Sequence, residues 1–176
     1  GRNLTVYVMD EHKMAEVVGY KIHRGALACG IIPPGRTLGW LRSKLEGKKS
    51  WRLLAIDAIN DLANMGSMMR SASVLGMDAI LISKDCCDPW YRRAIRVSMG
   101  HVFRIPVVRL DDMSMDLRLL AKEDGVESYA AIIDAHAVGL GAMRGRVPER
   151  WCVVLGNEDR GVSGAVRAAC RCGVRI

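Results

Sequence analysis

"WRLLAIDAINDLANMGSMMRSASVLGMDAILIS", residues 51–83, contains the repeating unit that decides the fold. Residues 51–56 and 78–83 are almost continuously apolar, which is the pattern of strands that are buried on both faces of a sheet. Residues 64–76 between them have apolar side chains at the spacing of one buried helical face. These are Met65, Met68, Met69, Ala72 and either Leu75 or Gly76. A strand, a helix and a second strand in this order predict a parallel pairing of the two strands.

The same alternation continues toward the C-terminal end of the sequence. It predicts helices at 89–100, 112–125 and 163–170, and strands at 101–108, 128–134, 150–156 and 173–176. Apolar strands that alternate with helices indicate an α/β fold, with a parallel sheet covered by helices on both faces. Neither a GxGxxG nor a GxxxxGK[ST] sequence is present, which argues against an ordinary dinucleotide or nucleoside-triphosphate enzyme.

The first part of the chain has a different character. Residues 4–9 and 24–32 are predicted strands, with a short helix at 11–18 between them. Two prolines and a glycine at 33–35 exclude regular structure there. A short amphipathic helix and a basic turn are expected at 37–49. We therefore predict a boundary near residue 50, which separates a region 1–49 from a region 50–176.

Composition and cysteine usage restrict the class of protein. Half of the 176 residues are apolar and about a quarter are charged, with no uncharged apolar run long enough to span a membrane. The start of the sequence has no signal-peptide pattern. Six cysteines show no usual zinc spacing, so a metal site is disfavoured and a reduced, intracellular protein is expected. Cys29 and Cys152 lie in apolar runs, where a thiol behaves as a small hydrophobe.

Three loops are expected beyond the carboxyl ends of strands, where parallel sheets bind their ligands. They begin after residues 56, 134 and 155. In the first loop we expect Asn64 to cap the following helix, Gly66 to allow close approach of another segment, and Arg70 to point back over the loop. In the third loop, Glu158 lies in a glycine-flanked turn. The alternative is a capped helix with a solvated arginine and an ordinary surface turn.

The two motifs in their order resemble the SpoU family of RNA ribose 2′-O-methyltransferases, within the knotted SPOUT superfamily. "DAINDLANMGSMMRSA" (57–72) matches the first family motif at Asp57, Asp61, Asn64, Gly66 and Arg70. "LGNEDRGVS" (155–163) matches the second at Gly156, Glu158, Gly161 and Ser163. Residues 88–108 are also similar to the family's central helix and strand. Leu62 stands where the family usually has proline, and Asp159 where glycine is common.

The resemblance implies a SPOUT-type sheet with a C-terminal trefoil knot. The family's third motif would follow Ile176, so the knot segment is expected to be truncated here. A chain that ended at Ile176 is expected to bind the cofactor poorly and to dimerise weakly, which puts its activity in doubt. Residues 4–32 are similar to the tail of the L30e-like substrate-binding domain of family members that act on ribosomal RNA. Ribosomal RNA is therefore favoured over transfer RNA as the substrate.

The family's chemistry implies S-adenosylmethionine as the cofactor, RNA as the substrate, a homodimer and no metal. The catalytic residues by resemblance are Asn64, Arg70 and Glu158. A guanidinium does not normally give up its proton, so Arg70 is not expected to act as a free base. Arg70 would instead anchor a phosphate, Asn64 would orient Arg70, and Glu158 would support both. The cofactor-binding residues by resemblance are Ile133, Asp134, Gly156, Asn157 and Ile176.

The charge distribution favours an acidic partner. The net charge is +7, and residues 86–109 alone carry a local charge of +4. Arg92, Arg93 and Arg96 are the predicted RNA-binding residues, with Trp90 and Tyr91 beside them as candidates for stacking on a base. A solvated helix face is the alternative for these arginines.

Two other functions stay open at this point: an inactive RNA-binding module of the same fold, and an α/β enzyme that uses a different nucleotide. The expected location is the cytoplasm, with the mitochondrion as the alternative. The sequence identifies neither the RNA nor the nucleotide that is modified.

Overall fold

The computed structural model describes residues 4–21 and 25–175, and its contacts divide the chain into two units, Gly1–Pro33 and Pro34–Ile176. In the first unit, helix α1 (Glu11–Val18) confirms the predicted helix; Asp10 caps it, and Gly19 ends it with a φ of 74°. The predicted strands at 4–9 and 24–32 are wrong for the described residues of these ranges, which belong to no strand and are largely exposed. An apolar stretch becomes a strand only where a second strand can hydrogen-bond to it. Cys29 is exposed as well, against expectation.

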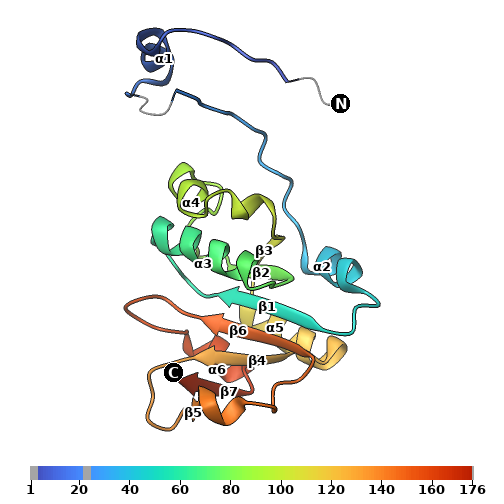
Figure 1. The fold of residues 1–176 in the computed structure, drawn as a ribbon. Helices are drawn as coiled ribbons and strands as arrows, with labels where there is room; N and C mark the ends of the chain where they lie inside the picture. Colours follow the sequence, from blue (N-terminus) through green and yellow to red (C-terminus); the bar gives the residue numbers. More distant parts are fainter. Residues whose placement is uncertain (1–3, 22–24, 176) are drawn as a thin grey trace. The chain divides into compact units, whose positions relative to one another are not determined.

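The second unit contains one sheet in which all pairs are parallel, as predicted (Figure 1). Its order is β3-β2-β1-β6-β4-β7-β5. The strands are β1 (Trp51–Ile56), β2 (Ala79–Ser83), β3 (Val107–Leu110), β4 (Glu127–Ala131), β5 (Val138–Gly139), β6 (Arg150–Leu155) and β7 (Cys172–Arg175). Strand β1 lies between β2 and β6, so that the two predicted motifs follow neighbouring strands.

Helices cover both faces of this sheet, which confirms the predicted layers. Helices α2 (Leu38–Leu45), α5 (Met113–Asp124) and α6 (Gly164–Ala169) pack on one face, in a core that includes Leu53 and Val154. Helices α3 (Leu62–Val74) and α4 (Arg92–Val97) pack on the other, in a core that includes Leu54 and Ile80. Successive side chains of a strand therefore pack into the cores on opposite faces of the sheet, because side chains alternate between the two faces.

Several boundaries differ from the prediction. Residues 101–108 are not one strand: His101–Phe103 forms a 3-10 turn, η1, and the strand starts at Val107. Pro106 has no N–H to donate to a ladder, and only its carbonyl accepts from Ile80 N. The helix predicted at 89–100 is shortened to α4. The strand β5 and the 3-10 turn η2 (Leu140–Met143) were not predicted, because two residues of strand leave no period to detect.

Helix α2 belongs to the second unit. Its Leu41 and Leu45 are buried in the same core as Trp51 and Leu117. The division of the chain therefore falls between Pro33 and Pro34, earlier than the predicted boundary near residue 50. The likeness of the first region to an L30e-like domain stays a prediction.

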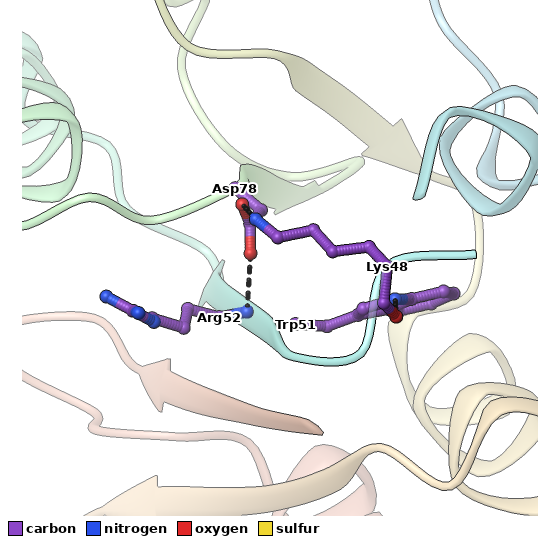
Figure 2. A network of polar contacts seen from close by, with 4 residues as sticks. All are labelled: Lys48, Trp51, Arg52 and Asp78. Atoms are coloured by element: carbon purple, nitrogen blue, oxygen red, sulfur yellow. Dashed lines mark hydrogen bonds and ion pairs between the residues drawn. The ribbon is translucent and has the colours of Figure 1, made fainter. Parts of the chain in front are cut away.

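The amino edge of the sheet, where the strands start, is closed by polar contacts (Figure 2). Lys48 forms an ion pair with Asp78, whose second carboxylate oxygen accepts from Arg52 N at 2.9 Å. Trp51 Nε1 donates to Lys48 O at 3.2 Å. The guanidinium of Arg150 lies 4.8 Å from the centre of the Trp51 ring. These contacts fix the turn that leads into β1.

Candidate active site

The sheet order brings four loops side by side along the carboxyl edge. From one side to the other they are residues 84–91 after β2, 57–61 after β1, 156–163 after β6 and 132–137 after β4. Hydrogen bonds connect neighbouring loops. Cys87 N donates to Ile59 O at 2.9 Å, and Asn157 Nδ2 donates to Ala58 O at 2.9 Å. The first three loops therefore form one connected surface.

The start of α3 differs from the prediction at its cap. Asp61, not Asn64, is the N-cap residue, and its carboxylate accepts from Asn64 N at 2.7 Å. Aspartate and asparagine both cap helices well, but the N-cap residue must have an extended backbone. Asp61 has this conformation, whereas Asn64 already lies inside α3. The Asn64 side chain therefore does not cap the helix, and its amide donates to Glu158 Oε1. The structure thus brings together two of the three predicted catalytic residues.

The loops after β1 and β6 are held together by buried or half-buried groups. Asp57, only 5% exposed, accepts from Ser163 N at 2.8 Å. Ala58 has a φ of 55°, which is uncommon for a residue with a Cβ atom. Its N–H donates to Ser83 Oγ and its carbonyl accepts from Asn157 Nδ2, both at 2.9 Å. Strained backbone of this kind persists where surrounding contacts fix it, and it gathers at functional sites.

The glycines of both motifs are required by close approach. A Cβ atom on Gly156 would lie 2.1 Å from Gly161 C, and one on Gly66 would lie 2.5 Å from Ala94 O. Asn157 and Gly161 exchange two backbone hydrogen bonds, of 3.1 and 2.8 Å, and Gly161 has a φ of 69°. The predicted bend around Glu158 is therefore a closed turn.

Arg70 is exposed, and the structure places it beside α4. Its Nη1 lies 3.5 Å from the sulfur of Met99, a residue with a φ of 52°. Arg70 follows Asn64 by about 1.7 turns of helix, so the two side chains leave α3 in different directions. The predicted orientation of Arg70 by Asn64 does not appear among the contacts of the described residues. The buried face of α3 also ends earlier than expected, because Leu75 is 69% exposed.

The loop after β4 forms a hollow of about 450 Å³ with the end of β7, lined by residues 131–135, Val174 and Arg175. Ile133 is fully exposed in this loop. Asp134 accepts from His136 N at 2.9 Å and pairs with Arg167 Nη2 at 2.6 Å. The bond from the His136 amide, and then that from Arg167, lower the pKa of the Asp134 carboxyl. The lining is apolar apart from backbone groups, Asp134 and Arg175, which fits a nucleoside with a charged tail.

The other predicted cofactor residues have structural partners. The Asn157 side chain holds Ala58 O and accepts from Asp159 N at 3.0 Å, while its backbone N–H and carbonyl both pair with Gly161. Gly156 is the residue between β6 and this turn. Ile176 lies outside the described residues.

A second hollow, of about 530 Å³, lies on α4 and is lined by Tyr91, Arg92, Arg93, Arg96 and Val97. It contains all three predicted RNA-binding arginines. Trp90 packs in the core beside α3 and α4, and its ring lies 5.9 Å from that of Phe103.

Arg109 contributes to the positive charge of residues 86–109 but has a different role. Its guanidinium donates to the carbonyls of Ser83, Lys84, Cys86 and Cys87. It therefore fixes the loop after β2.

The cysteines and histidines do not gather into a metal centre in the part of the chain that the structure describes. Burial raises the pKa of the Cys87 thiol, and raises that of Cys170 to about 11. His101 Nδ1 lies 2.9 Å from Ser73 Oγ. Among the described residues, no helix is both long and apolar enough to cross a bilayer.

Sequence reasoning missed Ser83, Ala58 and Arg167. Ser83 had a detectable signal, since it is a polar residue at the carboxyl end of a buried strand. Ala58 had none, because nothing in its residue type indicates a positive φ.

Residues 52–176 match the SpoU rRNA methylase family. An uncharacterized tRNA/rRNA methyltransferase of Mycobacterium tuberculosis is 33% identical over 93% of this chain and 55% of its own length. The 23S rRNA (guanosine(2553)-2′-O)-methyltransferase of Bacillus subtilis is 33% identical over 65% of this chain and 44% of its own. A crystal structure of an AdoMet-bound rRNA methyltransferase from Sinorhizobium meliloti has a TM-score of 0.66 and 25% identity, over 77% of this chain and 50% of that one. The chain thus spans about half the length of these relatives.

Proposed function

The chain belongs to the SpoU rRNA methylase family, and from this premise we propose that it methylates a ribose 2′-hydroxyl of RNA with S-adenosylmethionine. Ribosomal RNA is the favoured substrate, since the B. subtilis relative is named as a 23S rRNA 2′-O-methyltransferase. The homodimer expected from the family likeness belongs to the same proposal, and sedimentation measures it.

One observation carries this proposal: the order of features along the carboxyl edge. The arginine-lined hollow of α4 follows the loop after β2, and the apolar hollow with Asp134 follows β4. Strands β1 and β6 lie between β2 and β4. The hydrogen bond between Asn64, in the first turn of α3 after β1, and Glu158, in the loop after β6, therefore lies between the two hollows in this order. A polar contact between an apolar hollow and a cationic one suits a reaction between a nucleoside cofactor and a polyanion.

The residues of this edge have distinct tasks in the proposed reaction. A ribose hydroxyl is a poor nucleophile at neutral pH, so its position and the fate of its proton decide the rate. Arg70 is exposed on α3 and offers a planar fork of donors to a phosphate of the substrate. Glu158 fixes the amide of Asn64, which then holds a set orientation at the edge.

The cofactor supplies a methyl group on a positively charged sulfur, and the hollow beside β4 is the place for its nucleoside. Apolar side chains and backbone groups of residues 131–135 line the space for the base. Asp134 is kept ionised by His136 N and Arg167, so that a carboxylate is available for a positively charged or hydroxylated part of the ligand.

RNA is held on the other side, at Arg92, Arg93 and Arg96, and such contacts make affinity depend on salt. Changing all three to Ala should weaken binding to any RNA and flatten the dependence of affinity on salt concentration, with about 0.7 to 0.9 of a unit of slope lost per phosphate contact. An unchanged slope would remove this helix from the RNA-binding surface.

Methyl transfer tests the function directly. The protein is incubated with S-adenosylmethionine labelled in the methyl group and with ribosomal or transfer RNA, and nucleosides are identified by mass spectrometry. We expect 2′-O-methylated ribose in wild type, and loss of product with retained cofactor binding in Arg70→Ala. Arg70→Lys should also be poor, because an ammonium lacks the planar fork. Arg118→Ala, an exposed arginine on α5, is the matched control and should retain activity. Methylation of a base, or of no RNA at all, contradicts the proposal.

A further inference from the structure

Large aromatic side chains that reach solvent are few in the second unit. Among its described residues, Trp40, Tyr91 and Phe103 are the aromatics that rank as exposed, at 38%, 58% and 65%. Trp40 already has a cationic partner, since the Arg36 guanidinium lies 4.4 Å from the centre of its ring. Tyr91 and Phe103 both belong to the segment that contains α4. Exposed aromatic surface is thus concentrated beside the arginines.

Tyr91 differs from the aromatic residues around it. Trp90, the preceding residue, packs against the core beneath α4, and Phe103 lies against the Trp90 ring. Tyr91 precedes α4 as its N-cap residue, and its side chain makes no capping hydrogen bond. Tyr91 lines the hollow that also contains Arg93 and Arg96. The core and the helix cap therefore do not account for a large aromatic residue at this position.

The backbone of Tyr91 is held in place by hydrogen bonds at the carboxyl edge of the sheet. Arg109 binds four carbonyls of the loop after β2, and Cys87 N donates to Ile59 O in the neighbouring loop. Asp88 then accepts from Trp90 N at 2.9 Å, and its carbonyl accepts from Tyr91 N at 3.2 Å. A ring carried by such a short, hydrogen-bonded segment loses little conformational freedom when a ligand binds.

We propose that Tyr91 is a stacking platform for an unpaired base of the RNA substrate, while Arg93 and Arg96 hold the phosphates beside that base. The inference rests on the proposed function and narrows its substrate to RNA that is single-stranded at this point. Aromatic rings and arginines side by side are the usual chemistry of single-strand binding, because every base has a face that can stack. A duplex does not offer that face, since its bases are stacked on one another.

Fluorescence of 2-aminopurine tests the proposal, because its emission is quenched on stacking. A single-stranded RNA with this base at one position is titrated with wild type, Tyr91→Phe and Tyr91→Ala, and a duplex of the same sequence is titrated in parallel. Wild type and Tyr91→Phe should quench the single strand at some position of the probe. Tyr91→Ala should lose the quenching and bind about 5- to 150-fold more weakly, the range for one stacked base. The duplex should bind alike to all three proteins.

Met115→Ala is the control for removal of an exposed apolar side chain, since Met115 is 67% exposed on α5, which covers the other face of the sheet. It should behave as wild type. Equal single-strand affinity in wild type and Tyr91→Ala, or a duplex bound as tightly as the single strand, overturns the inference. If either of these outcomes is found in a protein that still methylates a ribose 2′-hydroxyl, the proposed function stands and only the stacking role of Tyr91 is wrong. If wild type neither binds nor methylates any RNA, both fail.

Discussion

At the amino edge of the sheet, the guanidinium of Arg150 donates to three backbone carbonyls and lies over the ring of Trp51. At the carboxyl edge, Arg93 and Arg96 are exposed on α4 and have no ion pair with any residue in 4–21 or 25–175. Arginine thus closes the amino edge, whereas the arginines of α4 leave the carboxyl edge cationic and Arg109 is bound to the carbonyls of the loop after β2. Net charge alone does not distinguish the two uses.

The two edges also differ in how their backbones are held. Around β1, the amino edge is fixed by long side chains: Arg150 reaches three backbone carbonyls, and Lys48 reaches the Asp78 carboxylate, which also accepts from the backbone N–H of Arg52 (Figure 2). Between β1 and β6, the carboxyl edge is fixed by short polar side chains and by glycines that permit tight turns, whereas Arg109 holds the loop after β2. Short groups leave the surface of the edge accessible. We therefore expect substitutions at the amino edge to change stability and to leave the turnover of folded protein unchanged, whereas substitutions at the carboxyl edge should lower activity.

Gly156→Ala should give the largest effect. The added Cβ would lie within 2.3 Å of backbone atoms of Gly161 and Val162, so the turn that carries Glu158 must open. We expect at least about a 100-fold loss of methyl transfer and a loss of about 2–4 kcal/mol in the free energy of unfolding. Gly164→Ala is the control, because a Cβ there meets nothing within 4 Å and alanine favours the helix. Full activity in Gly156→Ala would show that the closed turn is not required.

Arg150→Met should come next, and it should act on stability. The variant leaves the carbonyls of Lys48, Lys49 and Asp124 without their charged donor. We expect the free energy of unfolding in urea to fall by about 2–4 kcal/mol, with the turnover of folded protein unchanged. Arg93→Met should change stability by less than about 0.5 kcal/mol and weaken RNA binding. The opposite pattern in the two variants would reverse the assignment of the edges.

Ser83→Ala should give a smaller effect, on turnover. It removes the hydroxyl that accepts from Ala58 N and helps to hold the positive φ of that residue. We expect kcat to fall about tenfold, or about 1.4 kcal/mol, with KM for RNA unchanged.

Adding Ala58→Gly to Ser83→Ala should restore part of kcat, because glycine adopts a positive φ without strain. Ser114→Ala, on the α5 side of the sheet, is the control. A rise in KM without a change in kcat would show that Ser83 serves binding only.

The smallest expected effect is a shift in titration at Asp134. Its pKa is depressed in the fold, so the stability that its contacts provide is present above the pKa of the unfolded chain. That stability is lost as the pH falls through the lower, folded pKa. Arg167→Met should raise the pKa of Asp134 toward its ordinary value, while the bond from His136 N keeps part of the shift. NMR titration of the carboxyl carbon measures this, with Arg171→Met as a control. An unchanged pKa would mean that the ion pair is absent in solution.

The strands and helices of the second unit were largely predictable, because the period of apolar residues determines them. What the period cannot show is the partner of each polar group. Asp61 and Asn64 are both good caps, and the turn after β1 decides between them. Arg109 looked like an RNA-binding cation by its charge, but the loop after β2 presents four carbonyls to it. The predicted strand at 4–9 failed for a similar reason, since no second strand among the described residues pairs with it.

Of the candidate site, the two motifs and their shared edge were predictable, because parallel strands place their carboxyl ends together. The contact between Asn64 and Glu158 was expected only as a common network, and the structure shows it as a direct hydrogen bond. The position of Arg70 beside Met99 was not predictable, since it depends on how α4 packs against α3.

Hydrogen–deuterium exchange, with each ligand added in turn, tests the division of the sheet most directly. Saturating S-adenosylmethionine should slow the exchange of amides in 132–137 and 156–163, and single-stranded RNA should slow that of amides in 88–99. Amides in 46–52 at the amino edge should exchange at the same rate with either ligand. Protection at 46–52, or RNA protection at 132–137 without protection of α4, would contradict the assignment of the carboxyl edge as the active site.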